Sequence, residues 1–414
     1  MDRATLERRL LKITKSFAKL GGIWPNQNKY VKVLLWAMVD ITMISTVITQ
    51  IARIVHFGTL EIVIEQSSLI GAGILMMVKH GNYVLNATKL ESLLNDMSDD
   101  WSTNQLEEEF EIMMTYATRG TFLVKIYSIS SCISVAYFIQ LPWSPRLVHM
   151  LKHQNTSPPL IYSIPGYYFV EDDREYFYYI QLHAALCLFV VLVVFISCDT
   201  FYIVLVQHGC GLLTVAGYRF KNGVKKNSSI TKYTETEGKE IHESIWHSIQ
   251  GHQKAITFLE NVESTHVTYL FLTMGIIVVI LSITMVQVST MEVCFEFYKY
   301  IGFLIIQFLH LCFLSLQGQF VINSSDEIYD AIYEALWYNT HPKTQALHVL
   351  ALRRSLTPPR LTAGGLIELN MESLSRVTYL VVLFSTITKH WLGQIGIFQI
   401  LKLCVSYYTV LRSA

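Results

Sequence analysis

Two histidines in the chain have a spacing close to that of a zinc site. His242 and His247 frame the sequence HESIWH, in which a glutamate follows the first histidine. A helical zinc site needs its histidines four residues apart so that both lie on one face, and here they are five apart. Gly209-Cys210-Gly211 alone is not a dinucleotide loop, and the sequence contains neither a phosphate-binding loop nor a GxSxG serine motif. The motifs therefore indicate no enzyme, no metal site and no cofactor.

Asp199 is a candidate functional residue, because it is a charged residue inside a run of apolar residues. A charge within a membrane is costly, so a functional role is its default interpretation. The alternative is a carboxylate near the cytosolic end of its segment, satisfied by neighbouring backbone or hydroxyl groups, and the topology derived below favours this alternative. A later apolar segment carries polar residues that we expect to hold helices together, namely Gln307, His310, Gln317 and Gln319.

The composition explains why these polar residues stand out. Apolar residues make up 52% of the chain and charged residues 15%, with a mean hydropathy of +0.36. Soluble domains carry about 25% charged residues, so the balance indicates a membrane protein. The formal net charge is zero, which gives no reason to expect a nucleic-acid partner. The seven cysteines are odd in number and none is spaced CxxC, so neither a disulfide framework nor a zinc site is inferred.

Apolar stretches long enough to cross a bilayer occur repeatedly, and such a crossing takes about 20 residues. They predict an all-α polytopic membrane protein with seven transmembrane helices, near 31–56, 62–87, 112–141, 176–208, 254–288, 296–322 and after 366. Residues 1–30 precede them and form a basic segment with apolar residues at helical spacing. We expect this segment to lie along the membrane surface and to end at Gly21-Gly22 and Pro25.

Lysine and arginine residues predict the orientation of the bundle. The N-terminal segment and the loops at 209–253 and 323–365 are rich in them, whereas the turns at 57–60 and 289–295 contain none. The N-terminus is therefore expected in the cytosol. An odd number of spans puts the C-terminus outside, which inverts the topology of a G-protein-coupled receptor.

The segment between about 142 and 175 is predicted outside, as an irregular lid rich in proline. Of the sequons in the chain, Asn155 is the one that falls in an outer loop, so it is the glycosylation candidate.

Aromatic side chains gather at similar outer depth in three of the predicted spans. An apolar, aromatic cavity with few polar anchors suits a small volatile ligand. The alternative for each residue is the aromatic belt found at membrane interfaces. As a set they are the predicted ligand-binding residues: Tyr137, Phe138, Tyr178, Tyr179, His183, Phe297, Tyr298 and Phe303.

The last hundred residues carry a pattern of motifs. Ser325, Ala331, Tyr333 and Trp337 come first, followed by a second helical stretch at 345–356, the turn Leu361-Thr362-Ala363-Gly364, and finally Ser406-Tyr407-Tyr408-Thr409. In this order they resemble the C-terminal signature of insect odorant receptors. Hydropathy and inverted orientation agree with that family over almost the whole chain.

The resemblance implies a subunit of an odorant-gated, non-selective cation channel in the plasma membrane of olfactory sensory neurons. It implies a heterotetramer with a co-receptor subunit, a small volatile apolar ligand, and contact with membrane lipid. A six-helix bundle (31–322) would hold the pocket, and the region 323–365 would be a cytosolic anchor containing Ser325, Ala331, Tyr333 and Trp337. The last helix (366–414) would line the pore, with Val405, Tyr407, Tyr408, Thr409 and Val410 as its candidate residues. The second cytosolic loop is short, which resembles the ligand-tuned partner rather than the co-receptor.

The last unit departs from the family pattern, because about twenty residues near 377–399 are additional. An unbroken helix from 366 to 411 would be about 68 Å long, against a hydrocarbon core of about 30 Å. Either the segment breaks near 389–396 into two apolar pieces, or it is a translated intron or mis-spliced insertion. The family motif resumes beyond it, which favours the insertion.

Three other functions compete with this interpretation. A gustatory-type receptor channel would close with a different signature, which is absent here. A small-molecule transporter would often show internal repeats and broken helices, and no repeat is evident. A metabotropic receptor would have its N-terminus outside the cell.

Overall fold

Long helices make up most of the molecule. The computed structural model describes residues 3–103, 106–151, 160–225 and 235–391, and shows α-helices, two short 3-10 turns and one two-stranded hairpin. In chain order the elements are α1 (Arg3–Arg9), α2 (Lys12–Leu20), α3 (Lys29–Phe57), α4 (Leu60–Leu85), α5 (Ala87–Ser102), α6 (Glu107–Gln140), η1 (Leu141–Trp143), α7 (Ser144–Leu151), α8 (Phe177–Lys225), α9 (Glu235–Thr290), α10 (Phe295–Glu334), η2 (Trp337–Asn339), α11 (Pro342–Ser355), β1 (Thr362–Ala363), β2 (Ile367–Glu368) and α12 (Met371–Trp391).

Six of the described helices, α3, α4, α6, α8, α9 and α10, are long and apolar enough to cross a bilayer. They coincide with the first six predicted spans and confirm the all-α polytopic architecture. One face of α3 exposes large apolar side chains at helical spacing, a surface that is stable only against lipid. These side chains are Leu34, Met38, Ile41, Ile48, Ile51 and Val55.

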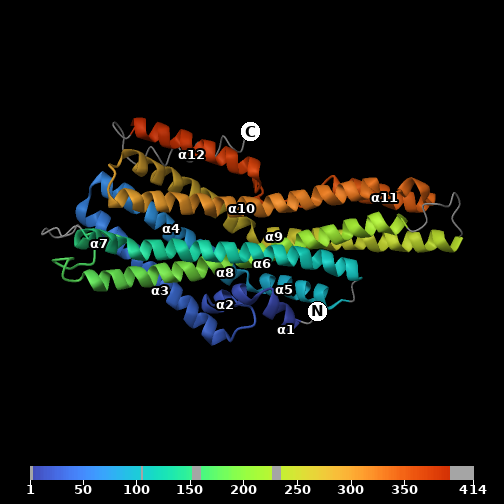
Figure 1. The fold of residues 1–414 in the computed structure, drawn as a ribbon, viewed down its shortest axis with the longest axis horizontal. Coiled ribbons are helices and arrows are strands. Elements are labelled where there is room, and N and C mark those ends of the chain that lie inside the picture. The colour runs from blue at the N-terminus through green and yellow to red at the C-terminus, as the bar shows by residue number, and fades with distance from the viewer. Residues whose placement is uncertain (1–2, 104–105, 152–159, 226–234, 392–414) are drawn as a thin grey trace.

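Several helices run well past the predicted spans, so the predicted loop at 209–253 is corrected. It is mostly helix, because α8 continues to Lys225 and α9 begins at Glu235. Helix α10 likewise continues unbroken through residues 325–334, into the region predicted as the anchor. These extensions are polar on one face, which hides them from a hydropathy search. The long helices α6, α8, α9 and α10 lie side by side along the longest axis (Figure 1).

The N-terminal segment packs its apolar side chains against the helical bundle. It forms two short helices rather than one, and α2 packs against α8. Leu6, Leu11 and Trp24 are almost fully buried. The predicted end of this segment is confirmed, because α2 stops at Leu20 and Gly22 adopts a positive φ of 70°. A left-handed backbone at this position favours glycine.

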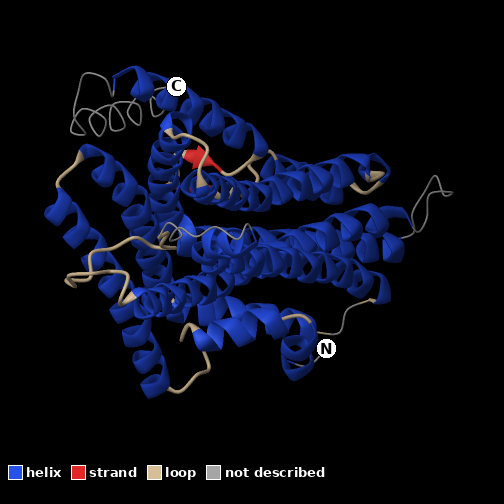
Figure 2. Cartoon of the chain, turned by 60° about the vertical axis from the view of Figure 1, so that its left-hand side comes forward, coloured by secondary structure: helices blue, strands red, loops and turns tan. Residues whose placement is uncertain are grey.

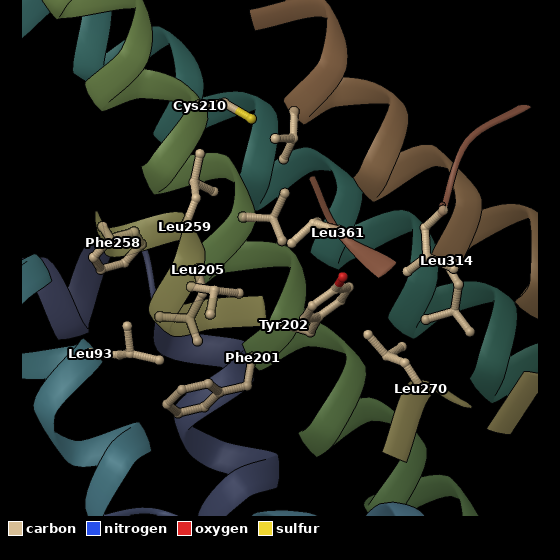
Figure 3. Close-up of a cluster of buried hydrophobic side chains, with 14 of the residues drawn as sticks. Leu93, Phe201, Tyr202, Leu205, Cys210, Phe258, Leu259, Leu270, Leu314 and Leu361 are labelled. Carbon is tan, nitrogen blue, oxygen red and sulfur yellow. The ribbon is translucent and has the colours of Figure 1, made fainter. Parts of the chain in front are cut away.

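The largest buried cluster lies where α8 crosses α9 and α10. Phe201, Tyr202 and Leu205 of α8 belong to this cluster together with Leu259 and Leu270 of α9 and Leu314 of α10 (Figure 3). Leu361, from the turn that precedes the hairpin, is buried in the same cluster. The predicted turn thus has a packing role that ties the C-terminal unit to the bundle.

The segment predicted as an irregular outer lid is partly helical. It begins with η1 and α7, and residues 160–176 then run without regular secondary structure. The irregular part is fixed to α3, since the Tyr167 amide donates to the Thr49 carbonyl at 2.9 Å and its ring stacks on His56 at 4.1 Å. Asn155 lies outside the described residues.

The C-terminal unit joins the bundle through a tight hairpin, visible as the one sheet in Figure 2. The loop between the strands has three residues, Gly364 to Leu366, and the Leu366 amide donates to the Ala363 carbonyl at 3.2 Å. Gly364 and Gly365 both have positive φ, 68° and 69°, which favours glycine at the two central positions of this turn. A methyl group at Gly318 of α10 would lie 1.7 Å from the Leu369 carbonyl oxygen, so α10 and the strand-to-helix connection touch backbone to backbone.

Helix α12 contains the first part of the suspected insertion near 377–399. Its 21 residues form one continuous helix of about 32 Å, enough to cross a bilayer. Asn370 caps its start, and Leu374, Val377 and Val381 are buried, while α12 packs against α9 and α10. The part of the suspected insertion that the structure describes, residues 377–391, therefore continues this packed helix without a break. Residues 392–399 lie outside the described part of the chain.

Ion pairs connect the helices at the end of the bundle that carries α5 and α11. Glu109 of α6 receives two hydrogen bonds from Arg219 of α8, at 2.6 and 2.7 Å. Asp100 of α5 is bonded by His208 of α8 at 3.0 Å and by Lys254 of α9. Burial raises the pKa of the Asp100 carboxyl, but the hydrogen bonds and positive charge of His208 and Lys254 outweigh it, so the pKa lies below its ordinary value.

Candidate ligand cavity

A cavity of about 190 Å³ lies between the helices, toward the end where α3 joins α4 and α9 joins α10. Residues from α3, α4, α6, α8, α9 and α10 line it, and its walls are overwhelmingly apolar. Its apolar lining includes Met43, Val47, Leu69, Leu75, Met76, Val135, Phe138, Ile164, Leu188, Val191, Leu192, Phe195, Ile277, Ile280, Phe303, Ile306, Leu309 and Phe313. Because dispersion and apolar burial act without direction, such a cavity accepts ligands by size and shape first.

The irregular segment after α7 closes one side of this cavity. Ser163 and Ile164 belong to the lining, and the Ser163 hydroxyl donates to the Phe138 carbonyl of α6 at 2.7 Å. The Tyr168 hydroxyl lies 2.9 Å from Nδ1 of His183, whose Nε2 lies 2.9 Å from the Ser45 hydroxyl of α3. Residues 160–176 are therefore bonded to the helices on both sides of the cavity.

A buried ion pair forms the floor on the opposite side. Lys79 of α4 contacts both oxygens of Asp199 of α8, at 2.7 and 2.8 Å, and the two side chains are 0% and 4% exposed. Tyr127 of α6 donates to Asp199, and His310 of α10 lies 3.2 Å from both the Lys79 nitrogen and the Tyr127 hydroxyl. Tyr127 and His310 also line the cavity. Four helices thus meet at one hydrogen-bonded cluster, which we call the polar floor.

The polar floor corrects our sequence interpretation of Asp199. That interpretation expected bonds to neighbouring backbone or hydroxyl groups near the cytosolic end. A hydroxyl partner is present in Tyr127, but the structure adds a salt bridge to Lys79, 120 positions away. Lys79 itself was missed, although it lies inside the second predicted span and the rule that singled out Asp199 applies to it equally. The structural role predicted for His310 and Gln307 is confirmed, since both are buried and bonded across helices.

The structure places two of the eight predicted ligand-binding residues in the cavity lining, Phe138 and Phe303, whose rings meet edge to face at 6.3 Å. Tyr137 lies beside them, but its hydroxyl donates to the Tyr298 carbonyl, and His183 is bonded to the closing segment. The remaining members lie away from the lining: Tyr178 and Tyr179 are 63% and 73% exposed, Tyr298 is 53% exposed, and Phe297 packs on Tyr298.

The predicted anchor residues occupy two settings. Ser325 is buried and donates to the Val321 carbonyl at 2.7 Å, and a methyl group at Gly217 of α8 would lie 3.3 Å from the Ala331 side chain. Ala331 therefore lies at a close approach of α8 and α10, and Ser325 is bonded within α10. Tyr333 is exposed and Trp337 stands in η2 beside Tyr338. The predicted pore residues, Val405 and Tyr407 to Val410, lie outside the described residues.

The two histidines of the HESIWH sequence diverge, which agrees with their spacing. His242 lies 3.1 Å from the Thr344 hydroxyl of α11, whereas His247 is exposed. Within the described residues, no group of three or more histidine, cysteine or acidic side chains is arranged to hold a metal ion.

The fold and the cavity together define a class, a polytopic helical membrane protein with an apolar cavity between its helices. The chain belongs to the 7tm odorant receptor family, whose model matches residues 59–382. That match reaches into α12 and ends at residue 382, within the suspected insertion.

Solved structures of the same fold are known. The insect olfactory receptor OR5 from Machilis hrabei in complex with eugenol superposes with a TM-score of 0.74 at 13% identity, over 93% of this chain and 98% of that one. A second structure of the same receptor, whose description names no ligand, superposes with a TM-score of 0.73 at 14% identity, over 94% of this chain and 99% of that one. No curated protein matches the sequence.

Proposed function

We propose that the chain is the ligand-tuned subunit of an odorant-gated, non-selective cation channel, assembled with a co-receptor as a heterotetramer in the plasma membrane of olfactory sensory neurons. The observation that carries the proposal is the apolar cavity between the helices in a member of the odorant receptor family. Its volume resembles that of an apolar cavity known to take up benzene, about 150 Å³. A small volatile ligand is of the right size and chemistry for it.

The distribution of basic residues supports a cytosolic N-terminus. Arg8 and Arg9 of α1, Lys221 near the end of α8, and Arg353 and Arg354 of α11 belong to elements away from the cavity. The turns after α3 and α9, at the cavity end, contain no lysine or arginine. The cavity then lies in the outer half of the membrane, where a ligand arrives.

Helix α10 offers a physical connection from the cavity to the C-terminal unit. It lines the cavity from Phe303 to Phe313 and, about 8 Å further along its axis, presses Gly318 against the Leu369 carbonyl. The Gln319 side chain accepts the Met371 amide at the start of α12. A ligand that favours one position of α10 therefore acts on the entry to α12, provided that its affinity differs between the two states. The helix that follows would line the pore through Val405 and Tyr407 to Val410 and gate by dewetting.

Whole-cell recording with an odorant panel tests this proposal. The chain is expressed alone, with a co-receptor, and with the co-receptor while G-protein signalling is blocked. Odorant-evoked cation current in the last two conditions is expected. Absence of current in every pairing, with surface expression verified by labelling, would contradict the channel assignment.

A matched pair of α6 variants tests the cavity. Ser134→Phe puts a ring into the lining, whereas Ala136→Phe adds the same ring on the exposed face of the same helix. We expect Ser134→Phe to raise the half-maximal odorant concentration at least about tenfold, and Ala136→Phe to leave it within about twofold. Equal responses from both variants would show that odorants bind elsewhere.

A further inference from the structure

The polar atoms of the cavity wall are almost all hydrogen-bond acceptors. Three serines of α6 form a stripe along the lining, and each hydroxyl donates to a carbonyl of its own helix. Ser130 and Ser131 donate to Tyr127, at 2.9 and 2.8 Å, and Ser134 donates to Ser130 at 2.7 Å. A hydroxyl has one donor and two acceptor sites. With its proton used, each serine offers the cavity an acceptor alone.

The other hydroxyl and thiol groups of the lining are committed in the same way. Thr46 donates within α3 or to Cys187, and Ser163 donates to Phe138 or Gln181. The Cys187 thiol lies 3.9 Å from the Thr42 carbonyl, which makes it at most a weak donor. None of these groups provides a free donor to a ligand.

The polar floor offers no free donor either. The Lys79 ammonium has three protons and three partners, the two Asp199 oxygens and His310. Tyr127 gives its proton to Asp199. With Nε2 of His310 accepting from Lys79, the proton on Nδ1 faces the Tyr127 hydroxyl. Every proton of the polar floor is therefore used within the cluster, and none is available to a ligand in the cavity.

Two glutamines remain, and each has an unsatisfied carbonyl oxygen. Gln50 of α3 and Gln307 of α10 line the cavity and are 2% and 9% exposed. Their Oε1 atoms are buried without a hydrogen-bond partner among the described residues. The Gln307 amide nitrogen donates to the Thr284 hydroxyl of α9 at 3.3 Å, which fixes its oxygen as the free group. Leaving a buried acceptor unpaired costs roughly 1–3 kcal/mol.

From this inventory we infer that the cavity selects small apolar ligands carrying one hydrogen-bond donor, such as an alcohol or phenol, over ligands of the same skeleton with only acceptors, such as a ketone or ether. The inference rests on the proposed function and names its ligand class. A hydroxyl pairs with a glutamine oxygen, whereas a ligand carbonyl meets acceptors on nearly every side. The Gln50 amide nitrogen is the sole donor left in this inventory of the described lining, so an acceptor-only ligand has one weak alternative.

Matched ligand pairs provide the test: 2-heptanol against 2-heptanone, and benzyl alcohol against benzaldehyde and benzyl methyl ether. Each is measured by evoked current and by ligand-induced thermal stabilisation of the purified receptor. The alcohol of each pair is expected to act at about tenfold lower concentration than its acceptor-only partner. Equal or reversed preference in both measurements would overturn the inference.

Variants assign the preference to the glutamines. Gln307→Met and Gln50→Met keep the side-chain length but remove the acceptor. Gln307→Met is expected to cut the alcohol preference severalfold while leaving the ketone unaffected or improved, because the Gln307 amide nitrogen is already bonded to Thr284. Gln50→Met also removes the one remaining donor, so it is expected to weaken the alcohol severalfold and the ketone by a smaller factor. Ile306→Val, an apolar change in the same lining, is the matched control and shifts both partners equally. Alcohol preference unchanged in both methionine variants would also overturn the inference. Stabilisation by alcohols without current would instead contradict the channel proposal, and no response to any compound in either measurement would contradict the ligand cavity itself.

Discussion

Removing one charge of the polar floor should destabilise the protein far more than removing both. Lys79 and Asp199 are buried almost completely, and Lys79 has no contact with solvent through which a lone charge could be hydrated. Lys79→Met leaves the Asp199 carboxylate with the Tyr127 hydroxyl as its main partner, and Asp199→Leu leaves an ammonium facing a histidine and the Phe195 ring. Breaking a buried pair typically costs 3–5 kcal/mol, whereas replacing both partners by apolar residues is often close to neutral.

The double variant Lys79→Met/Asp199→Leu should therefore recover most of the loss. The coupling between the two substitutions is expected to be roughly 3 kcal/mol or more, the kind of term a double-mutant cycle isolates. Thermal unfolding of detergent-solubilised protein and the fraction reaching the cell surface are the two assays. Lys239→Met is the matched control, because its ion pair with Glu235 is solvent-exposed and should contribute little. Additive losses in the double variant, or single variants as stable as the control, would refute the reasoning.

Three further perturbations follow from packing and charge. Gly318→Ala must displace the Leu369 backbone and should destabilise the protein by roughly 1–3 kcal/mol. Gly275→Ala is the control, because a methyl group there would meet open space and should leave stability unchanged. Equal unfolding temperatures for the two variants would contradict the backbone contact. Because the folded pKa of Asp100 is depressed, its contribution to stability is complete above the unfolded value of about 3.9 and disappears as pH falls through the folded value. Asp100→Asn should thus unfold at lower temperature than the wild type at neutral pH, and the gap should close under acid; a gap independent of pH would argue against the carboxylate. Deleting residues 377–399 removes the buried side chains of Val377 and Val381 and should abolish surface expression. Current recorded only after that deletion would support the mis-splicing hypothesis.

Hydropathy predicted the membrane-crossing helices because their signal is local. The same method failed at the ends of α8, α9 and α10 that lie away from the cavity, where one polar face lowers the mean hydropathy without interrupting the helix. It also could not place the N-terminal segment, since an apolar stripe containing Leu6 packs equally well on lipid or on a neighbouring helix. The stripe predicts a helix, and the choice of partner depends on tertiary packing.

The cavity residues illustrate a second limit. Depth along a helix can be estimated from residue number, and the predicted aromatics do lie near the cavity end. The direction of each side chain depends on how its helix is rotated in the bundle, and no single span reveals that rotation. Phe138 and Phe303 face inward, while Tyr178 and Tyr179 at similar depth face outward. The sequence did not show long-range partners either, because Lys79 and Asp199 lie 120 positions apart and are brought together by the packing of the helices.

The position of the polar floor explains how a charged pair and an apolar ligand site can share one bundle. An isolated charge next to the cavity would draw in water and raise the cost of placing an apolar molecule there. Here the charges sum to zero, and every proton in the cluster has an acceptor, so the face presented to the cavity is satisfied. The cluster still requires α4, α6, α8 and α10 to meet with correct geometry, since a poorly aligned buried pair costs more than it returns. Ligand selectivity then depends on the few lining groups that lack a hydrogen-bond partner. These are the side-chain oxygens of Gln50 on α3 and Gln307 on α10, which can accept a hydrogen bond from a ligand.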